Sequence, residues 1–97
     1  TQQAKAYFKQ ALILNNAYPP ALLEMQKISY QSGEYWAAKG YLQRYLSVAS
    51  HTSGTLWFGM QTERALGNAS LAKEYQNLLL EKFPLSDEAK QTQPVLQ

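Results

Sequence analysis

Residues 31–42 read QSGEYWAAKGYL, and residues 65–76 read ALGNASLAKEYQ. Each stretch holds a glycine at the same place, Gly33 in the first and Gly67 in the second. Each glycine closes an aromatic-rich apolar stretch and precedes a second stretch of helix length with an alanine five residues on. Because glycine readily adopts the left-handed conformation that ends many helices, the pattern predicts two helical hairpins, each turning at its glycine.

The interval from Gly33 to Gly67 matches the period of the tetratricopeptide repeat, about 34 residues, whose units are such hairpins. The second helix of a repeat carries a small residue and, four positions later, a large one, and a proline closes the unit. The matching positions are Gly33, Ala38 and Leu42 in residues 19–52, and Gly67, Ala72, Gln76 and Pro84 in residues 53–86. The sequence therefore resembles a tetratricopeptide array over most of its length.

The first helices match the repeat pattern less well. Leu22 and Met25 stand where Trp and Leu are expected, and the run 56–59 (LWFG) fits only with a one-residue shift of register. Upstream, residues 4–11 reproduce the second-helix signature with no first helix before it. We predict four segments: the second helix of a truncated repeat (1–16), two repeats (17–52 and 53–86), and a short capping helix with a tail (87–97).

The predicted fold class is all-α, with tetratricopeptide hairpins stacked in a right-handed superhelix. Apolar periodicity, proline and glycine place the helices. The expected helices in the first half of the chain are 3–14, 19–31 and about 35–48. A polar connector at 50–53 should follow, and then a helix that ends at Gly67. The last two expected helices are 69–82 and a short one that runs from an N-cap at Ser86 to about residue 91.

Two and a half repeats are fewer than such arrays usually need, since a hairpin cannot bury its apolar face alone. We therefore interpret the chain as the C-terminal piece of a longer array. One stripe of the first helix would then lose its cover and become a self-association surface. This stripe consists of Ala4, Phe8, Ala11 and Leu12.

Composition narrows the functional classes. The net charge is +2, with nine Lys and Arg against seven Asp and Glu spread along the chain. This balance indicates neither nucleic-acid binding nor an anionic membrane partner. The chain has no cysteine, which excludes disulfides and thiolate metal sites within it. It also has no run of about 18 apolar residues that could span a membrane.

Catalytic motifs are missing from the sequence. His51 is the single histidine, and the carboxylates are not clustered at metal-ligand spacing. No nucleophile elbow or glycine-rich phosphate loop is found. We expect no enzyme activity, cofactor or metal, and we interpret His51 as an exposed or locally capping residue. A role as the regulatory appendage of a catalytic domain stays open.

The inner wall of a tetratricopeptide superhelix is lined mainly by first helices and is the expected binding groove. Aromatic and cationic side chains together would anchor a peptide or protein segment. The candidate groove residues are Leu23, Lys27, Tyr30 and Gln31 in the first full repeat, and Trp57, Gln61 and Arg64 in the second. Two alternatives stay open: Trp57 belongs to the core, or Tyr30 packs against the neighbouring helix.

Several strings carry a more specific resemblance: 19–25 (PPALLEM), 38–46 (AKGYLQRYL), 56–59 (LWFG), 63–68 (ERALGN) and 82–89 (KFPLSDEA). Together they resemble the C-terminal repeats of the type IV pilus biogenesis tetratricopeptide proteins, which include the outer-membrane lipoprotein pilotin. The resemblance implies a parent protein at the periplasmic face of the outer membrane, held by a lipidated N-terminal cysteine. It also implies a non-catalytic scaffold that assists secretin localisation or assembly.

A generic tetratricopeptide adaptor or co-chaperone that binds a peptide segment is the alternative. Such adaptors read peptide termini through a carboxylate clamp, which needs several converging Lys, Arg and Asn side chains. Only Lys27 and Arg64 qualify in the predicted groove, so the pilus scaffold is favoured.

Overall fold

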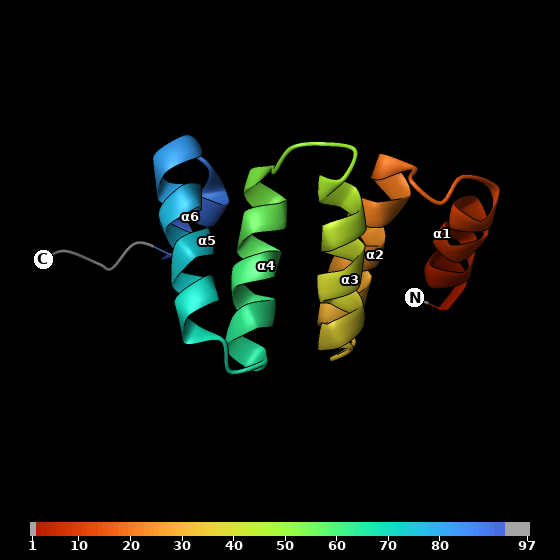
Figure 1. Ribbon diagram of the computed structural model, residues 1–97, viewed down its shortest axis with the longest axis horizontal. Coiled ribbons are helices and arrows are strands. Elements are labelled where there is room, and N and C mark those ends of the chain that lie inside the picture. Colours follow the sequence, from red (N-terminus) through yellow and green to blue (C-terminus); the bar gives the residue numbers. More distant parts are fainter. Residues whose placement is uncertain (1, 93–97) are drawn as a thin grey trace, which may run out of the picture. The chain divides into compact units, whose positions relative to one another are not determined.

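The computed structural model describes residues 2–92. This part of the chain forms α-helices and no strands (Figure 1), which confirms the all-α prediction. The chain divides into two compact units, residues 1–50 and 51–97. No helix among residues 2–92 is both long and apolar enough to cross a bilayer. The tail predicted after Thr92 lies outside the described residues, and the stacking of repeats stays a prediction.

Unit 1 contains three helices, α1 (Gln2–Leu14), α2 (Pro19–Gln31) and α3 (Tyr35–Leu46). The helix α2 packs against both α1 and α3. Two prolines open α2, where a first-turn position has no partner for its N–H group anyway. The helix α3 ends at Leu46, two residues before the predicted end at Val48.

Unit 2 also contains three helices, α4 (Ser53–Ala65), α5 (Ala69–Lys82) and α6 (Asp87–Thr92). The helix α4 begins within the segment that the sequence suggested as a connector, because Thr52 and Thr55 form a reciprocal capping box. The helix α6 begins after Ser86, whose Oγ accepts a hydrogen bond of 3.0 Å from the N–H of Ala89. It packs against both α4 and α5.

The two hairpin turns have the same geometry at equivalent positions of the two repeats. Gly33 has φ 79° and Gly67 has φ 82°, both in the left-handed region. The N–H groups of Glu34 and Asn68 donate to carbonyls five residues back, each over 2.8 Å. This is the pattern of a glycine-terminated helix, and it holds the following helix in the same register in each unit.

The buried positions of the first helices repeat at the same interval as the two glycines. Those that match are Ala21, Leu22, Met25, Gln26 and Ser29 in α2, and Thr55, Leu56, Gly59, Met60 and Glu63 in α4. The helix α4 also buries Thr62, whose equivalent in α2, Ile28, is half-buried. The helix α4 therefore follows the register of α2 without the one-residue shift that a fit of residues 56–59 to the repeat pattern would need. Leu56, and not Trp57, occupies the position equivalent to Leu22, because the turn at Gly67 fixes the register of the helix before it.

The second helices pack through small and large residues at equivalent positions. Ala38 and Ala72 are both buried and let the paired helices approach closely. Leu42 is buried, whereas its equivalent Gln76 is half-buried and donates to the carbonyl of Thr92 over 3.1 Å. Gln76 thus ties α5 to the end of α6.

The structure changes the prediction about an uncovered stripe on α1. Leu12 is 7% exposed and belongs to the core, and Ala4, Phe8 and Ala11 are half-buried. Three large side chains on α1 are more open, namely Tyr7, Ile13 and Leu14, which are 69%, 75% and 81% exposed. The prediction that Leu12 loses its cover is wrong, since its side chain is buried within unit 1.

Candidate binding surface

The predicted groove residues of unit 1 lie along one side of α2. Leu23, Lys27, Tyr30 and Gln31 follow the spacing that places side chains on one helical face. Lys27 and Gln31 are exposed, while Leu23 and Tyr30 are half-buried. This face borders the buried positions of α2, so it combines apolar surface at its base with polar groups in solvent.

Tyr30 also contributes to the packing of its hairpin. Its ring centroid lies 5.8 Å from that of Tyr35, with an interplanar angle of 51°. Tyr35 is the first residue of α3. Contacts of this kind between aromatic rings stabilise by about 0.5–1.5 kcal/mol, so Tyr30 is held in place by its neighbour while part of its surface stays open.

The predicted groove residues of unit 2 occupy the equivalent side of α4. Trp57, Gln61 and Arg64 stand one repeat after Leu23, Lys27 and Tyr30. Arg64 is exposed, and Trp57 and Gln61 are half-buried.

Trp57 has both a packing contact and open surface. It packs against the cluster of buried residues Leu56, Leu79 and Ala89. Its ring meets that of Phe58 edge-on, with a centroid distance of 5.1 Å. A half-buried tryptophan fixed by its neighbours is the kind of side chain that anchors protein partners.

The charged members of these two faces are available for a partner. Within residues 2–92, the side chains of Lys27 and Arg64 form no hydrogen bond or ion pair. No group of three or more His, Cys, Asp or Glu side chains that could hold a metal ion occurs in the described part of the chain. The two faces therefore offer cationic and apolar contacts for binding.

His51 lies in a packed environment, not in an exposed connector. Its Nδ1 is 2.9 Å from Oγ1 of Thr55, and its ring meets that of Tyr75 edge-on at a centroid distance of 5.6 Å. Burial lowers the pKa of His51 below its ordinary value. Burial, with Glu63 and Glu74 nearby, raises the pKa of Tyr75. His51 thus supports the start of α4, as the capping interpretation expected.

Glu63 is a buried carboxylate that the sequence did not single out. It is 2% exposed, and its Oε1 accepts a hydrogen bond of 2.7 Å from Nδ2 of Asn68. Asn68 stands at the N-cap position of α5, but its side chain makes no cap hydrogen bond. The pair joins the end of α4 to the start of α5, which is a structural role.

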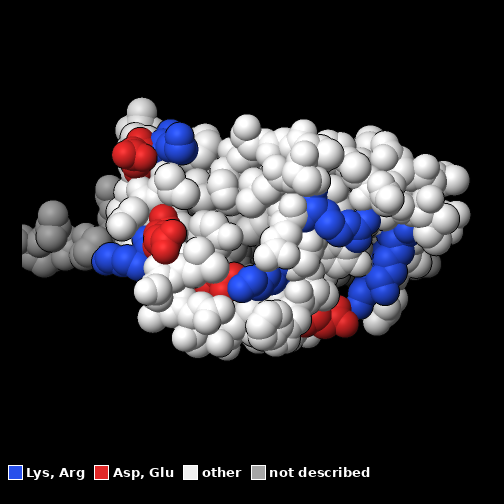
Figure 2. Space-filling model, in the orientation of Figure 1, with Lys and Arg blue, Asp and Glu red and all other residues white. Residues whose placement is uncertain are grey.

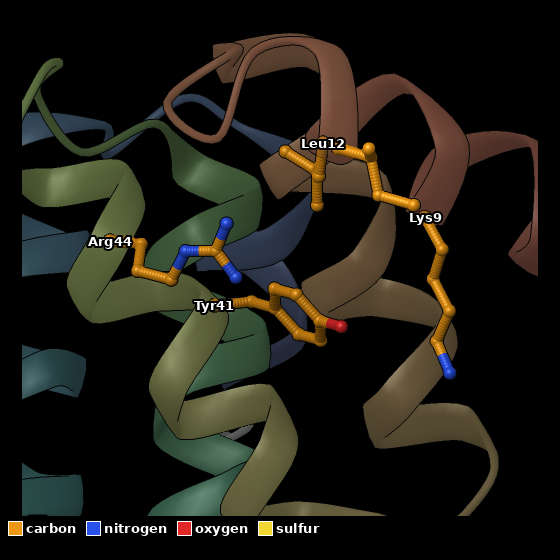
Figure 3. A pocket seen from close by; sticks show the side chains of 5 residues that line it. Lys9, Leu12, Tyr41 and Arg44 are labelled. Atoms are coloured by element: carbon orange, nitrogen blue, oxygen red, sulfur yellow. The ribbon is translucent and has the colours of Figure 1, made fainter.

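A pocket in unit 1 was also missed by the sequence analysis. It has a volume of about 330 Å³ and lies between α1 and α3. Its lining consists of Lys9, Leu12, Ile13, Tyr41 and Arg44. In Figure 3, the Tyr41 ring lies between the side chains of Arg44 and Lys9, with Leu12 beside it.

Arg44 is held in place at this pocket. Its Nη2 donates a hydrogen bond of 2.8 Å to the carbonyl of Asn16, and its guanidinium lies 5.5 Å from the centroid of the Tyr41 ring. The one sequence signal for this site is that neither α1 nor α3 contains an Asp or Glu.

The chain is similar to a known structure. It matches the crystal structure of PilW, a widely conserved type IV pilus biogenesis factor, with a TM-score of 0.80 and 33% sequence identity. The match covers 90% of this chain and 40% of the PilW chain, so this chain spans less than half the length of that protein. No protein-family profile and no curated protein sequence matches the chain.

Proposed function

We propose that this chain belongs to a type IV pilus biogenesis protein and acts there as a non-catalytic scaffold that binds another protein. The observation that carries the proposal is the similarity to PilW, at a TM-score of 0.80 and 33% identity over 90% of the chain. The two hairpins support it further, because repeated helical hairpins generally present surfaces for protein partners.

The finer proposal is that the partner is the outer-membrane secretin or another pilus-assembly component. The chain would then lie at the periplasmic face of the outer membrane, in a parent protein held there by a lipid anchor. This part of the proposal rests on the sequence strings between residues 19 and 89 that resemble the pilotin family.

The side of α2 and the equivalent side of α4 are the proposed docking faces. On α2, the exposed Lys27 lies one turn from the half-buried Leu23, and on α4 the exposed Arg64 lies two turns from the half-buried Trp57. An apolar anchor beside an unpaired cation favours a partner segment with apolar and acidic side chains. Binding of this kind needs no chemical step by the scaffold.

Charge reversal at Arg64 tests the proposal directly. The parent protein carrying Arg64→Glu is expressed in cells that lack the native copy, and the amount of assembled secretin multimer is measured by immunoblotting. Lys73→Glu is the matched control, because Lys73 is also exposed in unit 2, lacks a side-chain partner within residues 2–92 and gives the same change in charge. We expect fewer multimers with Arg64→Glu alone.

Lys27→Glu extends the test to the face on α2, where the same loss is expected. Each variant is accepted only if its circular dichroism matches that of the unchanged protein. Normal multimer levels and normal piliation with both Lys27→Glu and Arg64→Glu would remove these faces from the proposal. A carboxylate-clamp adaptor has no observation in its favour, since Lys27 and Arg64 are the only cations on the two faces.

A further inference from the structure

We infer that the pocket between α1 and α3 is a docking site for a second copy of this chain, and that the occupant is the turn around Leu85 together with Asp87 and Glu88. The pocket belongs to unit 1 and the turn to unit 2. The contact is separate from the proposed faces on α2 and α4.

The pocket combines an apolar base with positive charge, part of which is balanced by Glu34, since this residue pairs with Lys5 and lies near Lys9. Leu12 and Tyr41 contribute apolar surface, and Lys9 and Arg44 contribute cations. No carboxylate lines it, and α1 and α3 together hold four Lys and Arg and no Asp or Glu. Figure 2 shows Lys and Arg side chains over unit 1, with an acidic side chain beside them.

Ile13 adds exposed apolar surface to the pocket. It lines the pocket and is 75% exposed, and the neighbouring Leu14 is 81% exposed. Scattered exposed apolar residues are common on protein surfaces, but two large ones beside an apolar pocket make a patch that a partner would cover. A ligand for this site therefore carries an apolar side chain and negative charge.

The turn of residues 83–86 presents both of these features. Leu85 is 84% exposed, the most exposed large apolar side chain in the described part of the chain. Asp87 and Glu88 follow it in the first turn of α6, and neither forms an ion pair within residues 2–92. The segment thus offers one leucine for the apolar base and carboxylates for the two cations.

The turn is rigid, which lowers the entropic cost of docking. The N–H of Ser86 donates to the carbonyl of Phe83 over 3.1 Å, and Oγ of Ser86 donates to the same carbonyl over 2.7 Å. Phe83 packs against the core of unit 2. These contacts hold the backbone of the turn, while the Leu85 side chain stays in solvent.

The two units carry opposite net charges, as this contact requires: unit 1, which has the pocket, is positive, and unit 2, which has the turn, is slightly negative. Residues 2–50 contain five Lys and Arg and two Glu, whereas residues 51–92 contain four Lys and Arg and five Asp and Glu. The two surfaces of the contact differ, so it is heterologous, and each copy has one pocket and one turn. Copies would associate head to tail through a small and salt-sensitive interface.

Sedimentation velocity of the 97-residue chain, from about 10 µM to about 1 mM, measures this association over the range of weak interfaces. We expect the weight-average mass to rise with concentration and to fall when salt is added. Lys9→Glu, Asp87→Lys and Leu85→Ser should each weaken association by about tenfold or more. Lys73→Glu and Glu81→Lys are the matched controls, since both positions are exposed and outside the contact, and should leave it unchanged.

Mixing the two charge-reversed variants gives the sharpest test. Lys9→Glu and Asp87→Lys should each be monomeric alone and should associate with each other, because the mixture contains complementary surfaces again. A wild-type chain that stays monomeric at about 1 mM, association that survives Lys9→Glu and Leu85→Ser, or a mixture that fails to associate would each overturn the inference. Unchanged circular dichroism of each variant shows that a loss of association is not a loss of folding.

Discussion

Replacing Gly67 by alanine tests the turn that fixes the register of α4 and α5. Gly67 has φ 82°, and a Cβ added there would meet no atom within 4 Å. The cost of the substitution therefore comes from the backbone conformation and not from a clash. A left-handed conformation costs an L-residue about 1–2 kcal/mol. Alanine also has less conformational freedom than glycine in the unfolded chain, which offsets about 0.4–1 kcal/mol of this cost. Unit 2 should therefore lose about 1 kcal/mol of stability.

The chain offers a control with the same chemical change and the opposite expected sign. Gly40 lies within α3, outside the left-handed region, and a Cβ there would also meet nothing within 4 Å. Alanine is favoured over glycine in a helix by about 0.5–1 kcal/mol, so Gly40→Ala should stabilise unit 1. Gly33→Ala, at φ 79°, should destabilise unit 1 by about as much as Gly67→Ala destabilises unit 2.

Urea unfolding followed by tryptophan fluorescence can separate the two units, because Trp36 lies in unit 1 and Trp57 in unit 2. In a Trp36→Phe background, the signal reports on Trp57, which is half-buried. With a slope of about 1–3 kcal/mol/M, Gly67→Ala should lower the midpoint by about 0.3–1 M. Equal stability of Gly67→Ala and the parent chain, or a loss of stability in Gly40→Ala, would refute the reasoning.

Three further predictions concern unit 2. Leu79 is 0% exposed, so Leu79→Ala should lower the free energy of unfolding by about 2–5 kcal/mol in the same fluorescence assay. Leu85→Ala is the control, because Leu85 is 84% exposed, and it should change the free energy of unfolding by no more than about 0.5 kcal/mol. Thr52→Ala removes the side-chain cap of α4 and should cost about 1 kcal/mol, with Ser70→Ala as an exposed helical control. Burial lowers the pKa of His51, so the unfolded state binds more protons and stability should fall as the pH drops through the ordinary value of 6.5; His51→Asn should flatten this part of a midpoint-against-pH curve.

The positions of the helices could be predicted from the sequence because their signals are local. A glycine at the end of each first helix, an alanine five residues later and apolar residues at helical spacing each act within one hairpin. Gly33 and Gly67 adopt the left-handed conformation that these signals required. Some helix ends differ from the prediction by a few residues, because a capping residue sets where the helix begins, as Thr52 does for α4.

The repeat pattern left the register of α4 open between two alternatives, because of the position of one tryptophan. Trp57 lies one residue from the position where the repeat pattern expects Trp, which suggested a shift. The structure buries Leu56 and Met60 completely and leaves Trp57 half-buried. Unit 2 has Gly59 at the position equivalent to Met25, and it has Met60 at the next buried position, where unit 1 has Gln26. The methionine has thus moved by one residue. A sequence pattern that judges each position separately does not detect this change.

The pocket could not be predicted because its residues are distant in sequence. Lys9 belongs to α1 and Arg44 to α3, with the whole of α2 between them in the chain. Neither residue stands out alone, since single exposed cations say little about function. Only the packing of both helices against α2 gives them a common pocket with Leu12 and Tyr41.

Equivalent positions in the two hairpins have the same backbone conformation, but their side chains make different contacts. Glu34 and Asn68 both precede a second helix, and their N–H groups close identical turns. Glu34 reaches α1, where its Oε1 accepts a hydrogen bond of 2.8 Å from Lys5, whereas Asn68 turns back to the buried Glu63.

The same divergence holds at the proposed docking faces. Leu23 in α2 is replaced by Trp57 in α4, and Tyr30 by Arg64. The turns and the core do not require these positions to be alike, so their side chains are free to differ. A partner that docks on the proposed face of α4 would contact Trp57. Replacing Trp57 by leucine, the residue at the equivalent position of α2, should therefore weaken binding, while the buried residues of the hairpin stay the same.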